Sequence, residues 1–153
     1  MILELRKFII LIVITGFLSA CGGPTIRMGI SSSPDLNPNR TQSPLSVVVR
    51  IYQLRDISSF ESATFNEIWK NDLNALTGTV LTRKEIVIHP GVNKEIILDR
   101  HEDAKYIGVA AIFRNPRDRK WRDIQELSTS LVGSRFSTSF SVSLVGNSIN
   151  IAE

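Results

Sequence analysis

The chain of 153 residues is poor in the side chains that carry catalysis or metal binding. It contains one cysteine, Cys21, and two histidines, His89 and His101. A single cysteine cannot form a disulfide within the chain, so a packed core must hold the folded state. His89 precedes Pro90-Gly91, which is typical of a surface turn. The neighbouring side chains of His101-Glu102-Asp103 point in different directions, which favours a solvated loop over a metal or acid–base site.

A strong excess of charge and a glycine-rich phosphate loop are also missing. The formal net charge is +3, from 18 Lys and Arg against 15 Asp and Glu, which is too mild to indicate nucleic-acid binding. Arg117, Arg119 and Lys120 beside Trp121 could touch an anionic surface, but Asp118 interrupts the run and a basic hairpin loop is the commoner meaning. These absences predict a protein that is not an enzyme, has no cofactor or metal, and binds neither nucleic acid nor a small-molecule substrate. A periplasmic hydrolase is the least supported class.

The long hydrophobic run of this sequence lies at its N-terminus. Arg6-Lys7 precedes an uncharged segment from Phe8 to Ala20, which is the order of a secretory signal peptide. The segment is shorter than the roughly 20 apolar residues that a membrane-spanning helix needs. Ser19-Ala20-Cys21 at its end resembles the lipobox of bacterial lipoproteins. An ordinary secretory signal with an incidental cysteine is the alternative.

The lipobox resemblance implies that residues 1–20 are removed and that Cys21 becomes an acylated N-terminus. Stable attachment to a membrane takes at least two acyl chains, and lipoproteins of this kind carry three, palmitate among them. Gly22-Gly23 follows the cysteine, and the absence of an aspartate there implies transport to the outer membrane. We therefore expect a lipid anchor on the periplasmic face of the outer membrane.

Residues 21–44 are rich in glycine, proline, serine and asparagine. This composition predicts an acylated N-terminus followed by a flexible tether, which would span roughly 25–30 Å as a coil. The alternative is that residues 26–30 pack along the domain as an edge strand. The folded domain is expected over residues 45–153.

From Leu45 onwards, short apolar runs alternate with turns, and the period is mostly that of β-strands. Strands are expected near residues 45–54, 85–88, 95–98, 106–114, 121–127, 136–144 and 148–151, and residues 79–82 are expected to form a weak strand or an irregular segment. A helix is expected from Glu61 to Lys70, with Ala63, Phe65, Ile68 and Trp69 on the face that meets a sheet. The pattern predicts an all-β sandwich with a short helical insertion after the first strand.

Several segments, in this order, resemble one family. They are VVVRIYQLRD, Phe60 with the Ala63, Phe65 and Trp69 helix, Pro90-Gly91, YIGVAAIFRNP, and Trp121-Arg122. They are similar to segments of the outer-membrane lipoprotein of type VI secretion systems, the TssJ (VasD) family, which also begins with a lipobox. Leu76-Thr77-Gly78 departs from the Leu-Gly pair of that family. The resemblance implies a transthyretin-like β-sandwich held at the outer membrane by lipid.

The resemblance also implies partners. These are the periplasmic C-terminal part of TssM, an inner-membrane protein, and TssL in the same membrane complex. The family places the partner contact in the loop after the first strand, which maps here to Arg55, Asp56, Ile57, Ser58, Ser59 and Phe60. Apolar Ile57 and Phe60 among polar residues have the composition of a protein interface, although both could instead fasten the helix to the sandwich.

A second function remains open on the sequence alone. A lipid-anchored periplasmic module could bind peptidoglycan or another glycan. Such a module would need exposed aromatic residues on one face of a sheet, and Tyr52, Trp69, Tyr106 and Trp121 are available for this.

Overall fold

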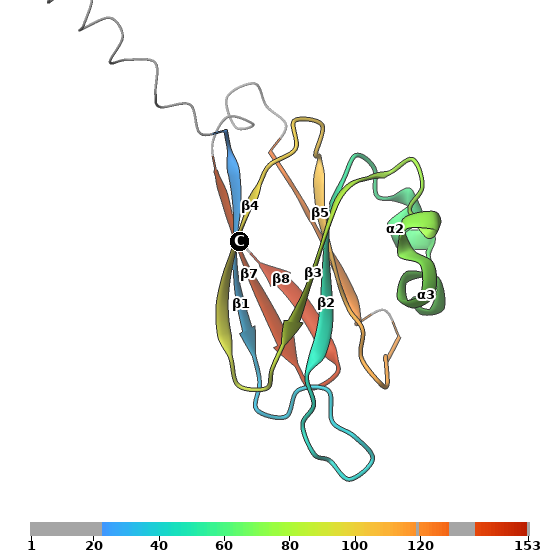
Figure 1. Ribbon diagram of the computed structural model, residues 1–153, viewed down its shortest axis with the longest axis vertical. Coiled ribbons are helices and arrows are strands. Elements are labelled where there is room, and N and C mark those ends of the chain that lie inside the picture. Colours follow the sequence, from blue (N-terminus) through green and yellow to red (C-terminus); the bar gives the residue numbers. More distant parts are fainter. Residues whose placement is uncertain (1–22, 119, 129–136, 153) are drawn as a thin grey trace, which may run out of the picture.

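The structure, a computed structural model, describes residues 23–118, 120–128 and 137–152. The expected signal peptide and Cys21 lie outside these residues. Two four-stranded sheets face each other, and two helices lie beside the second sheet (Figure 1). The strands are β1 (Thr25–Ser32), β2 (Val47–Leu54), β3 (Val80–Ile88), β4 (Asn93–Asp99), β5 (Tyr106–Ala111), β6 (Arg122–Glu126), β7 (Thr138–Val145) and β8 (Ser148–Ala152), and the helices are α2 (Ser58–Ser62) and α3 (Phe65–Ala75). The expected β-sandwich is confirmed, and no described helix is long and apolar enough to cross a membrane.

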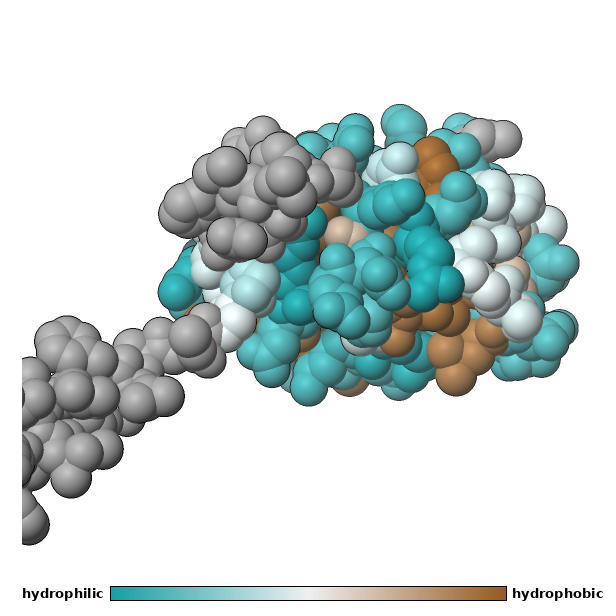
Figure 2. All heavy atoms as spheres, turned by 90° about the horizontal axis from the view of Figure 1, so that it is seen from above, coloured by the Kyte–Doolittle hydropathy of each residue, from teal (hydrophilic) through white to brown (hydrophobic). Residues whose placement is uncertain are grey.

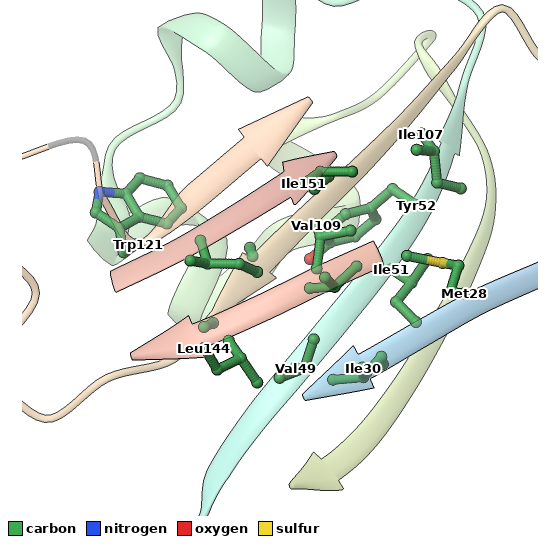
Figure 3. Packing of buried hydrophobic residues seen from close by; sticks show 14 of the residues in the cluster. Met28, Ile30, Val49, Ile51, Tyr52, Ile107, Val109, Trp121, Leu144 and Ile151 are labelled. Atoms are coloured by element: carbon green, nitrogen blue, oxygen red, sulfur yellow. The ribbon is translucent and has the colours of Figure 1, made fainter. Parts of the chain in front are cut away.

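The first sheet has the strand order β4-β1-β7-β8 and the second has the order β3-β2-β5-β6. Neighbouring strands are antiparallel, except that β1 and β7 run parallel. Apolar side chains from the facing sides of both sheets form the core. Figure 3 shows Met28 and Ile30 of β1, Val49 and Ile51 of β2, and Leu144 of β7 turned into the space between the sheets.

β1 corrects the expectation of a flexible tether over residues 21–44. Thr25–Ser32 is an interior strand with β4 on one side and β7 on the other. Ile26, Met28 and Ile30 are at most 1% exposed, because alternate side chains of a strand point to the same face. The strand is therefore part of the domain, and it is not the edge strand that the alternative allowed. The domain begins about twenty residues earlier than the expected boundary at Leu45.

The segment between β1 and β2, residues 33–46, is also held to the domain, and we call it the β1–β2 loop. Leu36 is fully buried. The Asn37 side chain donates to the Ser46 carbonyl oxygen at 2.8 Å and accepts from the Arg114 backbone N–H at 2.8 Å. The Leu45 N–H donates to the Leu36 carbonyl at 3.0 Å. These contacts close the base of the loop, so its tip is the part that projects.

The helical insertion follows β2, the second strand, rather than the first. It consists of two helices where one was expected. α3 begins with a capping box, in which the Glu67 carboxylate accepts from the Thr64 backbone N–H and the Thr64 hydroxyl accepts from the Glu67 backbone N–H. Ile68 and Asp72 form the buried side of α3. Trp69 is 50% exposed, so the expectation that it shares the buried face is wrong.

The remaining strand predictions are confirmed with shifted ends. β3 joins the two expected segments at 79–82 and 85–88 into one strand. The turn at His89-Pro90-Gly91 carries the chain from β3 in the second sheet to β4 in the first, so these two strands are not hydrogen-bonded to each other. The alternation in β7 is as expected, with Phe140, Val142 and Leu144 buried.

Gly108 in β5 allows the helical insertion to lie close to the second sheet. A Cβ atom at this position would lie 3.2 Å from two ring atoms of Phe60 and 3.1 Å from Cδ1 of Leu54. Phe60 also packs on Tyr52, with ring centroids 5.6 Å apart. A methyl group here would be closer to these side chains than ordinary van der Waals contact allows, so Leu54 or Phe60 would have to shift.

Gly108→Ala is therefore expected to lower the free energy of unfolding by about 1–3 kcal/mol through overpacking. Gly29→Ala is the matched control, because its nearest neighbour would be the Phe140 carbonyl oxygen at 4.0 Å, and it should have little effect. Urea unfolding of the two variants measures both values. Equal stability of the two variants would contradict the close packing of Phe60.

Candidate functional site

The sandwich has two ends along its long axis. The N-terminal end holds the start of β1, the end of β2 and the start of β5 (Figure 1). The far end holds the β1–β2 loop, the β3–β4 turn, the β5–β6 connection (residues 112–121) and the Gly146-Asn147 turn. Figure 2 views the molecule from the N-terminal end and shows hydrophilic residues over much of the visible surface.

The residues expected to contact a partner, Arg55 to Phe60, lie at the N-terminal end. Arg55 Nη2 is 3.0 Å from Asp103 Oδ2, and both side chains are about half exposed. Asp56 accepts hydrogen bonds from the side chain and backbone of Ser58, which hold the pKa of this carboxyl below its ordinary value. Ile57 is half-buried and Ser59 is partly exposed. Arg55 to Ser59 thus remain available at the surface.

Phe60 differs from the other five because its side chain is fully buried. Arg122 of β6 lies 5.7 Å from the centre of the Phe60 ring and donates hydrogen bonds to the carbonyl oxygens of Phe60 and Ala63. Phe60 therefore fastens the helical insertion to the second sheet, and it is not available to contact a partner.

Asp72 forms the centre of an ionic cluster that the sequence reasoning missed. Its Oδ2 accepts from Tyr52 Oη at 2.7 Å and from Arg83 Nε at 2.6 Å, and Arg50 Nη1 lies 3.4 Å away. Arg50 also bonds Glu85, with Nε 2.8 Å from Oε2. The cluster joins α3 to β2 and β3. A signal was present in the sequence, because Arg50 and Tyr52 alternate on one face of a strand and an acid follows on the helix.

Charges in this cluster shift the pKa values of its members. Burial of Asp72 by itself raises its pKa, but the hydrogen bonds from Arg83 and Tyr52 and the charge of Arg50 outweigh burial, so the pKa lies below its ordinary value. Burial, followed by the hydrogen bond to Asp72, raises the pKa of Tyr52 well above its ordinary value. The cluster contains no histidine, serine or cysteine that could act as a nucleophile with a base, so its arrangement is suited to holding α3 in place.

The far end carries two adjoining hollows between the β1–β2 loop and the β5–β6 connection. The larger, about 440 Å³, is lined by Asn39, Arg40, Arg114, Asn115, Arg117 and Asn147, among others. The smaller, about 300 Å³, shares Arg117 and Asn147 with it and adds Lys120. The basic run at residues 117–120 was visible in the sequence, but the convergence of Arg40 and Arg114 upon it was not.

The tip of the β1–β2 loop is ordered by its own hydrogen bonds. The Asn39 side-chain oxygen accepts from the backbone N–H groups of Thr41 at 2.8 Å and Ser43 at 2.9 Å. The Ser43 carbonyl in turn accepts from the Asn39 N–H at 2.9 Å. Residues 40–44 are all exposed. The tip is therefore a preformed projection with polar side chains.

The aromatic residues considered for glycan binding do not form an exposed platform. Tyr52 is fully buried, and Trp121 is 4% exposed beneath Phe65, with ring centroids 5.3 Å apart. Tyr106 is partly buried. Trp69 alone of the four is largely exposed, and it lies on α3 rather than on a sheet. Among the described residues, moreover, no His, Cys, Asp and Glu side chains are grouped so as to hold a metal ion.

Residues 24–141 match a family model described as type VI secretion lipoprotein, VasD, EvfM, TssJ. The chain belongs to this family of type VI secretion lipoproteins. The match begins at Pro24 and so includes β1, whereas the segments that carried the resemblance begin with VVVRIYQLRD in β2. Membership places the chain among membrane-bound structural lipoproteins of this secretion system.

Solved structures give the same result for the fold. The lipoprotein TssJ1 from Pseudomonas aeruginosa is 21% identical, with a TM-score of 0.76 over 86% of this chain and 96% of that one. A chain of a structure described as the TssM C-terminal domain from EAEC is 28% identical, with a TM-score of 0.70 over 84% and 98%. A chain of a type VI membrane complex is 29% identical, with a TM-score of 0.74 over 86% and 100%. Comparison with curated proteins finds no match.

Proposed function

We propose that this protein is the outer-membrane anchor of a type VI secretion membrane complex. Acyl chains on Cys21 hold it on the periplasmic face, and its domain binds the periplasmic C-terminal part of TssM, with TssL in the same complex. The observation that carries the proposal is the family match over residues 24–141. The likeness to chains of a TssM structure and of a membrane complex supports it.

The position of β1 sets how the anchored domain would stand. β1 begins at Thr25, four residues after Cys21. Four residues reach at most about 14 Å, in contrast to the longer tether that the composition predicted. The N-terminal end of the sandwich would therefore face the outer membrane, and the far end would point into the periplasm.

This orientation bears on the partner contact. The family resemblance places that contact after the first strand, and the first strand is β1 rather than β2. The corresponding segment is thus the β1–β2 loop, residues 33–46, in place of Arg55 to Phe60. A partner rooted in the inner membrane approaches from the periplasm and meets the far end first. We place the contact at the tip of this loop, and Arg55 to Ser59 is the alternative.

Two loop replacements separate these sites. Replacing residues 38–44 with glycine and serine at constant length is expected to weaken capture of a purified periplasmic TssM fragment from the same organism by at least 100-fold. Replacing Arg55 to Ser58 in the same way should leave capture within a few-fold of the native protein. Asn37 and Leu45, which close the base of the loop, remain unchanged in the first variant.

Biolayer interferometry measures both affinities, and circular dichroism checks the fold of each variant. Loss of capture only in the Arg55 to Ser58 variant would move the contact to the N-terminal end. Absence of binding by the native protein would overturn the proposed function itself.

A further inference from the structure

We infer that the far end is a receptor for an acidic segment of the partner protein, bound by Arg40, Arg114, Arg117 and Lys120. This inference rests on the proposed function. It widens the contact from the β1–β2 loop to the β5–β6 connection, and it states the chemistry of the surface that binds there.

The four cations come from two separate connections, and the fold holds these together. Arg40 lies on the β1–β2 loop, and the other three follow β5. The Arg114 backbone N–H donates to the Asn37 side chain at 2.8 Å, so the two connections are joined at their base. The side chains then line the same pair of hollows. A site formed in advance loses little conformational entropy when it binds.

Some surface cations have an acidic partner among the described residues, and others, such as Lys84 and Lys94, do not. Arg27 pairs with Glu95 at 2.8 Å, and Arg83 pairs with Glu85 at 2.6 Å. None of the four far-end cations makes an ion pair with a described residue. Asp35 lines the smaller hollow with Arg117 and Lys120, but the cations outnumber the acids at this end. The excess positive charges repel one another, and an external anion would relieve that repulsion.

The two ends of the sandwich differ in charge. Described connections at the N-terminal end hold the cations Arg55, Arg100 and Lys105 and the acids Asp56, Glu102 and Asp103. Those at the far end hold the cations Arg40, Arg114, Arg117 and Lys120 and the acids Asp35 and Asp118. Three cations against three acids balance, whereas four against two leave an excess of +2. Positive charge is thus concentrated on the end that would face the periplasm.

The occupant that fits this end is a polypeptide carrying Asp and Glu. Guanidinium groups bind carboxylates through paired hydrogen bonds, and three of the four cations are arginines. The amides of Asn39, Asn115 and Asn147 line the same hollow and can bond both N–H and C=O groups of a backbone. Headgroups of the anchoring membrane lie at the opposite end of the domain in the proposed orientation.

A charge-reversal experiment tests this inference. Arg40→Glu, Arg114→Glu and Arg117→Glu are combined in one variant, and Lys70→Glu, Lys84→Glu and Lys94→Glu form the control. The control residues are exposed on α3, β3 and β4. The control therefore changes the net charge by the same amount as the far-end variant, but at positions outside the hollows. The probe is the purified periplasmic TssM fragment in 50 and 300 mM NaCl.

The far-end variant is expected to bind at least 100-fold more weakly at 50 mM NaCl, and the control less than 5-fold more weakly. Native affinity should fall about tenfold or more at the higher salt, because salt screens exposed charges. A milder set, Arg40→Gln, Arg114→Gln and Arg117→Gln, should fall between native and reversed proteins, and it covers the case in which three new glutamates disturb the fold.

The outcomes distinguish the inference from the proposed function. Equal loss in the far-end variant and in the control would overturn the acidic receptor, even if replacement of residues 38–44 still abolishes capture. A native affinity independent of salt would do the same. Binding of the native far end to purified peptidoglycan, lost on charge reversal while TssM binding persists, would assign the cations to a glycan and overturn the inference.

Discussion

A Cys21→Ala variant is expected to disappear from the outer-membrane fraction while its β-sandwich stays folded. The proposed anchor consists of acyl chains, each of which contributes about 0.8 kcal/mol per buried methylene. Without the thiol, no chain can be attached at this position, so the loss of outer-membrane association should be complete. Separation of membranes on a sucrose gradient, with an outer-membrane marker protein, measures this effect.

The domain itself should be unaffected because its described core begins with β1. A purified domain starting at Gly23 should therefore bind the TssM fragment with native affinity, although it cannot hold a complex at the membrane. Gly23→Ala in the full chain is the matched control, since a Cβ at this residue meets nothing within 4 Å. Outer-membrane association that persists in Cys21→Ala would rule out acylation of Cys21 as the anchor.

Asp72→Asn is expected to lower the free energy of unfolding by about 3 kcal/mol. Removing one partner of a buried ion pair costs about 3–5 kcal/mol because the remaining charge is left uncompensated. The lower value applies here because Arg83 is 28% exposed and water can solvate it. Urea unfolding at pH 7 measures the loss. Glu95→Gln is the control, since the Arg27–Glu95 pair is about half exposed and should contribute at most about 1 kcal/mol.

The same variant predicts a change in the pH dependence of stability. The pKa of Asp72 is lower in the folded state than its ordinary value of 3.8. The unfolded chain therefore binds more protons in the interval below that value. The contribution of Asp72 is complete above about pH 5, and it is lost as pH falls through the folded pKa. Asp72→Asn should flatten this part of the profile, and an unchanged acid profile would show that Asp72 is not stabilised by its neighbours.

Alternation of apolar residues was enough to predict most strands. β2 and β7 each place apolar residues at every second position, and the prediction follows because side chains of a strand point to opposite faces in turn. β1 has the same alternation in Ile26, Met28 and Ile30, but glycine, serine and proline around it indicated a flexible segment. In the structure, hydrogen bonds to β4 on one side and to β7 on the other hold this segment as a strand despite its composition.

The choice of the first strand also determines which loop is the candidate site. The rule that the contact follows the first strand was applied to β2, so it selected Arg55 to Phe60. Trp69 was placed on the buried face of a helix because its spacing from Phe65 suits one. In the structure, Asp72 takes the inner position beside Ile68, since Arg50 and Arg83 offer it partners on the sheet.

The sequence by itself determined the expectation of an exported, acylated chain, the β-sandwich class and the family, because these depend on local composition, on alternation and on the order of segments. Only the tertiary structure decided that β1 is an interior strand and that Arg40 lies beside Arg114 and Arg117. The physical reason is distance along the chain. Ile26 pairs with Leu98 and Thr138, and no local pattern specifies hydrogen-bonding partners so far away. That pairing decides which loops lie at the same end of the sandwich. It therefore also decides which residues form the surface that we propose meets the partner.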